Sequence, residues 1–442
     1  MTAPILAAVI LITLKGCFEF FLERLNSRHV ERNRHRIPSI FRGVFDRKTF
    51  DRANDYTLAK SALDRKESVF DAVVLAAILV LGVIPLLYDS LSAWLGFGLW
   101  GQSLVFVTVM VVLSLPGWPF EWYSQFRLEE SFGFNKSTQR LWWTDKLKGL
   151  LLGYAIGTPL AALVLWIAVS YPEGWWILGF AVVFAFQLLM LVLYPILVVP
   201  LFNKLRPLEE GPLKERLMSL ADRTGFRAKT IQVIDGSKRS SHSNAYFTGF
   251  GRFRRIVLFD TLLEQLRPDQ IEAVLAHEIG HYRKGHIPRM IAVSAAGLFV
   301  GFWILHWLAA QDWFLAGFGF TESPAIHGPL ARYVPAFLLF LVLGGLVTFW
   351  ISPLFRWLSR RHEYEADRFA RDAMGTAKPL ILALRTLYRE NLGNLIPHPN
   401  YSRFHYSHPT LREREKALRE DDSGDALPDA PGAEPRTEGG AS

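Results

Sequence analysis

The sequence predicts a mainly α-helical, polytopic membrane protein with about seven transmembrane helices, on the strength of three observations. The 442-residue chain is 50% hydrophobic, and its mean hydropathy of +0.18 is higher than expected for a soluble protein of this length. The apolar residues form long blocks of the length, about 20 residues, that crosses a bilayer. Lys and Arg occupy alternate loops between the blocks, a pattern that sets orientation in a membrane.

Seven apolar blocks are candidate spans. The first could be a signal peptide, but Lys15 and Glu19 follow its apolar run in place of a small-residue cleavage site, so we interpret it as a retained span. These two residues lie four apart on one helix face, either near the interface or lining a water-filled cavity. The fifth block is long enough to tilt or to end in a turn at Pro195 or Pro200. The seven blocks lie near residues 3–22, 69–91, 103–124, 148–171, 176–203, 289–310 and 329–351.

Basic residues alternate between the two sides of the predicted membrane. Lys and Arg are frequent in four stretches, which are loops 23–68, 125–147 and 204–288 and the segment after residue 351. The intervening loops contain neither Lys nor Arg; these are loops 92–102, 172–175 and 311–328. Because cytoplasmic loops carry the excess of positive charge, we expect the amino terminus outside and the carboxyl terminus on the cytoplasmic side. An odd number of spans requires those opposite sides.

The net charge of +8 does not indicate nucleic acid, because no zinc-finger or RNA-binding signature accompanies the basic loops. We expect a lipid bilayer as partner and no nucleic acid. The single cysteine, Cys17, excludes an intrachain disulfide and a Cys-based zinc site, and we expect it to be a small buried hydrophobe. The tail from about residue 420 is rich in Asp, Glu, Pro and Gly, which predicts disorder.

A metal-binding pattern lies in residues 268–286, PDQIEAVLAHEIGHYRKGH. Pro268 suits the first turn of a helix. On that helix His277 and His281 are four residues apart, so both imidazoles project from one face, at the spacing that a single zinc ion needs from two ligands. Glu278 follows the first histidine, where its carboxylate can reach a water beside the metal rather than the metal itself.

A third ligand is expected from a second helix, predicted over residues 359–375 in the segment LSRRHEYEADRFARDAMG. Glu363 and Asp367 share one face of it, whereas Glu365 points about 160° away. We choose Glu363 as the ligand and Asp367 as the group that orients a zinc-bound histidine or the catalytic water. Two alternatives stay open: His362 replaces Glu363, or the carboxylates pair with neighbouring arginines on a solvated face.

Two histidines and one glutamate leave a fourth zinc position open, which is the catalytic arrangement rather than the structural one. The pattern therefore predicts a hydrolase with one Zn²⁺ per chain. Zinc lowers the pKa of a water towards about 7 and polarises a carbonyl. Glu278 would accept the proton of this water and deliver it to the leaving amine.

At this point the sequence resembles the zinc-dependent CAAX prenyl endopeptidases of type 1, which are integral membrane proteases. The resemblance implies the zinc ligands His277, His281 and Glu363 and the catalytic Glu278. It places at Asp367 an aspartate that is sometimes assigned as proton donor. The segments that carry it are EESFGFNKST (129–138), LFNKLRPLEEGPLKERL (201–217), VIDGSKRSSHSNAYFTGFG (233–251), IVLFDTLL (256–263), HEIGH (277–281), SRRHEYEADRFA (359–370) and YSHPTLRER (406–414).

The resemblance also implies substrate-binding residues. Asn244, Ala245 and Tyr246 fall on an edge strand that would pair with an extended peptide, since an exposed edge offers backbone hydrogen bonds without demanding a sequence. His408 and Arg414 fall near the reacting carbonyl, where they could stabilise a developing oxyanion. The ordinary alternatives are a plain strand–turn–strand and an N-capped helix.

Beyond the site, the resemblance implies seven helices around a water-filled chamber and a gluzincin-like zinc domain with a small β-sheet on its cytoplasmic side. A bacterial inner membrane is the location that the family's distribution implies. We divide the chain into five parts: a membrane region (1–204), the HExxH part of the protease domain (205–288), spans six and seven (289–351), the C-terminal part of the protease domain (352–419) and an acidic tail (420–442).

The leading hypothesis is a membrane endopeptidase that cleaves extended peptides or proteins, including prenylated CAAX-type C-termini. A related alternative is a quality-control protease of the stress-response type. An alternative of another class is a catalytically inactive membrane scaffold, which predicts damage to the metal motif, and none is visible. A transporter would place ionisable residues in mid-span, whereas this His/Glu cluster flanks spans six and seven.

Overall fold

The computed structural model describes residues 1–226, 230–248, 255–320 and 328–420 of the chain. The described part is mainly helical and contains one small four-stranded sheet, which confirms the predicted fold class. The acidic tail that we predicted to be disordered lies outside the described residues from residue 421 onward.

Ten of the described helices build the apolar, elongated part of the molecule. Short 3₁₀ or π-helical turns at Leu115–Gly117, Ser124–Glu129 and Tyr194–Val198 join some of them. A further short helix, α13, covers Asp312–Gly317. The ten are α1 (Ala3–Asn33), α2 (Arg47–Val80), α3 (Val83–Leu95), α4 (Leu99–Ser114), α5 (Trp118–Tyr123), α6 (Gln139–Ser170), α7 (Trp175–Leu193), α8 (Val199–Phe202), α12 (His286–Ala309) and α15 (Leu330–Met374).

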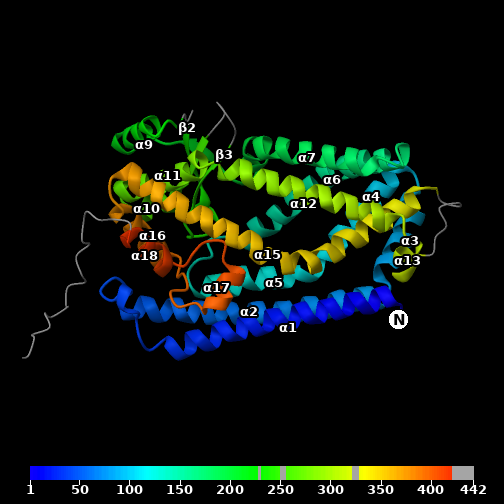
Figure 1. Cartoon of the computed structure of the whole chain (residues 1–442), viewed down its shortest axis with the longest axis horizontal. Helices are drawn as coiled ribbons and strands as arrows, with labels where there is room; N and C mark the ends of the chain where they lie inside the picture. Colours follow the sequence, from blue (N-terminus) through cyan, green and yellow to red (C-terminus); the bar gives the residue numbers. More distant parts are fainter. Residues whose placement is uncertain (227–229, 249–254, 321–327, 421–442) are drawn as a thin grey trace, which may run out of the picture.

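The sheet and the remaining helices gather at one end of the long helices (Figure 1). Two short 3₁₀ turns cover Ser39–Phe41 and Gly236–Lys238. The helices are α9 (Pro212–Arg223), α10 (Asp260–Gln265), α11 (Pro268–Arg283), α16 (Lys378–Glu390), α17 (Pro399–His405) and α18 (Leu411–Glu420). The strands are β1 (Leu205–Pro207), β2 (Thr230–Ile234), β3 (Ala245–Thr248) and β4 (Arg255–Phe259).

The number of spans agrees with the prediction. Six described helical stretches are long and apolar enough to cross a membrane, and the pair α2 and α3 makes a seventh if it counts as one bent span. That pair corresponds to the predicted span 69–91, which is not a single straight helix. It bends by 61° at Gly82, whose left-handed φ of +66° costs glycine little. The fifth span contains a π-helical turn around Pro195, one of the two prolines at which the sequence allowed it to end, and it continues as α8 to Phe202.

One predicted loop proved to be largely helical, and one predicted helix proved to be longer than expected. Segment 23–68 is mostly the ends of α1 and α2, since its charged residues are good helix formers and the helices project beyond the bilayer. The ligand-bearing helix, expected to start near Ser359, is instead the continuation of span seven in the 45-residue α15. Pro353 lies inside it without ending it, and the predicted end is confirmed by the left-handed Gly375.

Two hydrophobic cores follow this layout. One lies between the long apolar helices and includes Tyr88, Leu165 and Trp175. The other lies beneath the sheet and α11, and it includes Phe41 from the segment that links α1 to α2 and Phe50 from the first turn of α2. The start of the chain therefore packs against the end of the molecule that holds the sheet, besides contributing helices to the membrane part.

Large apolar side chains on the long helices face outward. Val73, Leu151 and Val347 are 63%, 62% and 56% exposed, which is typical of a surface that lipid covers. Cys17 lies on such a face of α1 and is exposed, so the expectation of a buried cysteine was wrong. Lys15 and Glu19 form the expected pair, with 3.2 Å between Nζ and Oε2.

The sheet has the order β1-β2-β4-β3. Strands β2 and β4 are parallel, whereas β1 and β3 run antiparallel to their neighbours. Strand β3 pairs Ala245 with Leu258 and Tyr246 with Val257 of β4. Within the described residues no strand pairs with the other side of β3, so β3 is an edge strand of the sheet.

Candidate metal centre

Helix α11 presents both predicted histidines. Pro268 opens it, and buried Ile271 and Ile279 anchor it in the hydrophobic core. Gly280 lets it approach α15 closely, since a Cβ there would lie 3.0 Å from the Cα and the carbonyl oxygen of Ala366. This close crossing brings the HEIGH segment of α11 against the EYEAD segment of α15.

The three predicted ligands converge at this crossing. The Nε2 atoms of His277 and His281 are 3.2 Å apart. From the Glu363 carboxylate, Oε2 lies 3.4 Å from His277 Nε2 and Oε1 lies 3.3 Å from His281 Nε2. Among the described residues these three form the group that could hold a metal ion.

The donor set fits zinc. Ligands at about 2.0–2.1 Å in a tetrahedral arrangement lie about 3.3 Å from one another, which is the spacing found here. Glu363 Oε2 is buried and accepts no hydrogen bond within the described part of the chain. Burial and the nearby Arg414 lower the pKa of His277, but the adjacent carboxylates of Asp367 and Glu363 outweigh them and raise it to about 9. The surroundings therefore favour a positive charge at this place.

Glu278, which also belongs to α11, lies beside the three predicted ligands. It lines a cavity of about 600 Å³ together with His281 and apolar residues of α7 and α12. Burial raises the pKa of its carboxyl group, which the neighbouring histidines only partly oppose. A carboxylate whose pKa is shifted towards neutrality is suited to accept a proton from water and pass it on.

Asp367 lies behind His277. Its Oδ1 is 2.8 Å from His277 Nδ1, the nitrogen that does not face the other ligands. The buried guanidinium of Arg414 binds both oxygens of Asp367, with 2.8 Å from Nε to Oδ2 and 2.5 Å from Nη2 to Oδ1. Arg414 Nη1 also lies 3.5 Å from Glu363 Oε2. The donors of Arg414 are therefore directed at carboxylates of the site, and Nη2 also lies 3.3 Å from His277 Nδ1.

His408 and β3 border the site on other sides. His408 Nε2 is 3.4 Å from Glu363 Oε1, and its side chain is 63% exposed, so one face of the ring is open. Ala245 and Tyr246 belong to edge strand β3, while Asn244 precedes it and accepts the Phe259 N–H through its carbonyl oxygen. Strand β3 contacts α11, the helix that carries His277.

The remaining histidine and acidic side chains of the two motifs have other partners. His362, the alternative ligand, stacks on His286 with 4.1 Å between ring centroids and does not join the ligand group. Glu365 points away from the ligands, as the helical spacing predicted, and faces His286. Our sequence reasoning gave His286 and Glu365 no role. The only sign of this role in the sequence was the position of His286, five residues after His281. The proximity of His286 and Glu365 depends on how three helices meet.

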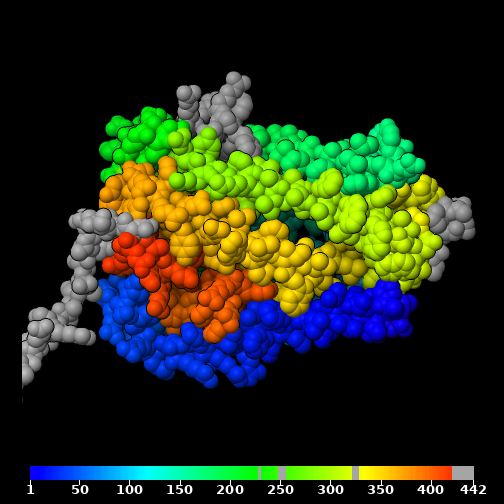
Figure 2. Space-filling model, in the orientation of Figure 1, coloured from blue at the N-terminus to red at the C-terminus, as the bar shows by residue number. Residues whose placement is uncertain are grey.

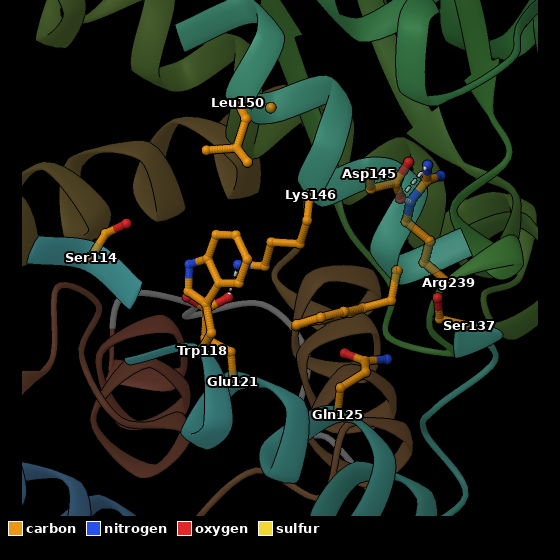
Figure 3. A pocket seen from close by; sticks show the side chains of 11 residues that line it. Ser114, Trp118, Glu121, Gln125, Ser137, Asp145, Lys146, Leu150 and Arg239 are labelled. Atoms are coloured by element: carbon orange, nitrogen blue, oxygen red, sulfur yellow. Dashed lines mark hydrogen bonds and ion pairs between the residues drawn. The ribbon is translucent and has the colours of Figure 1, made fainter. Parts of the chain in front are cut away.

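A second recess lies where the membrane helices meet the loop after β2 (Figure 3). Lys146 of α6 pairs with Glu121 and lies 5.2 Å from the ring centroid of Trp118. Arg239 faces Asp145 of α6 at 2.9 Å. The two cations are thus paired with carboxylates, and the Arg239–Asp145 pair ties the sheet-bearing end of the molecule to a membrane helix.

The fold and site together define a membrane-embedded metallopeptidase. Comparison with known proteins agrees. The family pattern described as "CAAX prenyl protease N-terminal, five membrane helices" matches residues 26–204, and that of peptidase family M48 matches residues 207–422. The chain therefore belongs to the CAAX prenyl protease 1 family of M48 peptidases.

Individual relatives resemble the chain over nearly its whole length. CAAX prenyl protease 1 of Saccharomyces cerevisiae is 38% identical over 413 residues, which cover 87% of this chain and 88% of that protein. The homologue from Homo sapiens is 31% identical, covering 91% and 92% of the two chains. The crystal structure of S. mikatae Ste24p superposes with a TM-score of 0.86 at 34% identity, covering 95% of this chain and 99% of that one.

Proposed function

We propose that this chain is a zinc metalloendopeptidase that holds one Zn²⁺ through His277, His281 and Glu363. The observation that carries the proposal is the convergence of the two Nε2 atoms and the Glu363 carboxylate, with 3.2 Å between the nitrogens and 3.4 and 3.3 Å from them to Oε2 and Oε1, beside the partly buried Glu278. When bound there, zinc would polarise the scissile carbonyl and lower the pKa of a water towards about 7.

The chain's own residues divide the remaining tasks. Glu278 accepts the proton of the attacking water and delivers it to the leaving amine. Asp367 accepts the Nδ1–H of His277 and so fixes the tautomer that leaves Nε2 free as a ligand. His408, with its exposed ring beside Glu363, donates a hydrogen bond to the carbonyl oxygen as that oxygen gains charge. Arg414 holds Asp367 and Glu363 in place.

The substrate is an extended peptide that adds a strand to β3 at Ala245 and Tyr246, next to Asn244. Another cavity, separate from the recess in Figure 3 and of about 360 Å³, is lined by Tyr246 and by apolar residues of α7 and its extension. It shares Gln187, Leu191 and Ile291 with the cavity at Glu278. A path lined mostly by apolar side chains thus runs from the strand to Glu278.

That path supports a peptide with an apolar or lipidated C-terminal group, as the name of the CAAX prenyl protease relatives suggests. We propose further that the long helices enclose a chamber, since the surface between α12 and α15 is hollowed in Figure 2. The excess of Lys and Arg in alternate loops supports a cytoplasmic active site. The bacterial inner membrane stays a proposal that rests on the resemblance alone.

The test is peptide cleavage by detergent-purified protein, with zinc content measured on the same samples. Glu278→Gln keeps the size of the side chain and removes the proton acceptor, so we expect zinc to stay and the cleavage rate to fall at least about a hundredfold. Cleavage of a farnesylated peptide is compared with that of the same peptide without the lipid. Equal rates would favour the quality-control alternative, and a variant as active as wild type would refute the role of Glu278.

A further inference from the structure

His281, like His277, has a partner at the ring nitrogen that does not face the metal site. Helix α11 ends at Arg283, and Gly285 adopts a left-handed φ of +69° before α12 begins at His286. This tight turn directs the His286 side chain back towards α11. Its Nδ1 lies 2.9 Å from Nδ1 of His281, and the residue is only 3% exposed.

The hydrogen-bond partners determine which nitrogen carries each proton. His281 uses Nε2 towards the metal site, so its Nδ1 bears the hydrogen and donates it to Nδ1 of His286. His286 must then carry its own hydrogen on Nε2. That atom lies 3.0 Å from Oε2 of Glu365, a carboxylate that can only accept. The chain His281–His286–Glu365 is satisfied at each step with both imidazoles neutral.

Packing holds the middle member of this chain in place. The ring of His362 stacks on the ring of His286 with an interplanar angle of 10°. Arg289 Nη1 lies 3.6 Å from Glu365 Oε2 and keeps the carboxylate on this side of α15. Because His286 cannot turn without losing both hydrogen bonds and the stacking contact, it presents a fixed acceptor to His281.

We propose that His286 and Glu365 are positioning residues of the metal centre, which hold His281 in the tautomer and orientation that present Nε2 to the ion. The inference rests on the metal site proposed above. It makes Glu365 the counterpart of Asp367: α15 supplies a carboxylate behind each imidazole ligand, directly for His277 and through His286 for His281. Partners of this kind typically contribute ten- to a hundredfold to metal affinity.

Two variants of similar size separate the acceptor from the packing. In His286→Asn, Oδ1 takes the place of Nδ1 and can still accept the His281 N–H. In His286→Leu, no acceptor remains. Zinc affinity is measured on detergent-purified protein by competition with a chromophoric chelator at buffered free Zn²⁺. We expect the dissociation constant of the Leu variant to rise ten- to a hundredfold and that of the Asn variant to stay within about threefold of wild type.

Glu365, whose side chain is 33% exposed, offers a second pair if the Leu variant does not fold. Glu365→Gln keeps an acceptor for His286 Nε2–H, whereas Glu365→Met removes it, so only the Met variant should bind zinc more weakly. Thermal unfolding of each variant at saturating zinc shows whether the fold is intact.

Equal zinc affinity for the two members of each folded pair would overturn the inference. Failure of the metal site itself looks different, because wild-type protein would then hold no zinc at all. If wild type and both His286 variants bind zinc alike, the metal site stands and only the positioning role is lost.

Discussion

At the scale of single residues, α15 uses three acidic side chains at alternate positions for three tasks. Glu363 faces the two histidines of α11, and Asp367 lies behind His277. Glu365 lies on the opposite side of the helix and reaches His286. Because side chains two positions apart on a helix differ by about 200° in direction, this spacing separates the middle carboxylate from the outer two. One short segment thereby serves both imidazole ligands.

Arg414 provides the first prediction at this scale. It is buried against Asp367 and Glu363, so Arg414→Met removes the cation that pairs with Asp367 and borders Glu363 and should destabilise the protein by about 3–5 kcal/mol. Thermal unfolding in detergent measures the loss. Arg414→Lys keeps the charge but not the bidentate geometry, so its stability should lie between those of Arg414→Met and wild type. If Arg414→Met lowers only the turnover number and leaves unfolding unchanged, Arg414 acts on the substrate carbonyl instead.

At the scale of elements, the distance between α11 and α15 determines whether the ligands meet. Gly280 lies at the crossing, so Gly280→Ala places a Cβ 3.0 Å from backbone atoms of Ala366. Backbone cannot yield as a flexible side chain does, so the two helices must move apart. We expect zinc affinity and cleavage both to fall at least about tenfold, as the ligands lose their geometry. Zinc competition and a cleavage assay measure the two effects.

The matched control is Gly297→Ala. This glycine is also helical, on α12, but a Cβ there meets no atom within 4 Å. The substitution should therefore leave both zinc affinity and cleavage unchanged. A Gly280→Ala variant with wild-type zinc affinity would show that the crossing tolerates a wider spacing. Some other contact would then keep Glu363 in position against α11.

At the scale of the whole molecule, the sheet-bearing end is attached to the membrane helices at several places. Phe41 and Phe50 enter its core from the start of the chain, and Arg239 pairs with Asp145 of α6. Helix α15 runs through both parts. The two ends of the molecule are therefore built from interleaved stretches of sequence.

Orientation in the membrane can be tested with single cysteines. The protein has one cysteine, so Cys17→Ala yields a background without any. The positive-inside pattern predicts that Glu173→Cys, in a loop without Lys or Arg, is labelled by an impermeant maleimide on intact cells. Glu209→Cys, which is exposed near β1, should be labelled only after the cells are opened. The reverse pattern would place the metal centre outside.

Local spacing predicted the parts of the site that lie within one helix. The four-residue separations place His277 beside His281, and Glu363 on the same face as Asp367, whatever the rest of the chain does. The His281–His286–Glu365 chain could not be predicted in this way, because it depends on the turn at Gly285 and on the meeting of α11, α12 and α15. Likewise, burial of Cys17 was mispredicted because a bilayer, unlike water, accepts an apolar face that no protein covers.

The continuity of α15 has a mechanical consequence. Glu363 lies 33 residues beyond the first residue of this 45-residue helix, a distance of about 50 Å along its axis. If such a helix pivots near its far end, a tilt of one degree displaces the carboxylate by about 0.9 Å, a large fraction of a ligand bond length. Long helices accommodate a change in bilayer thickness partly by tilting, so we expect lipids of different chain length to alter the coordination geometry and the activity of the enzyme.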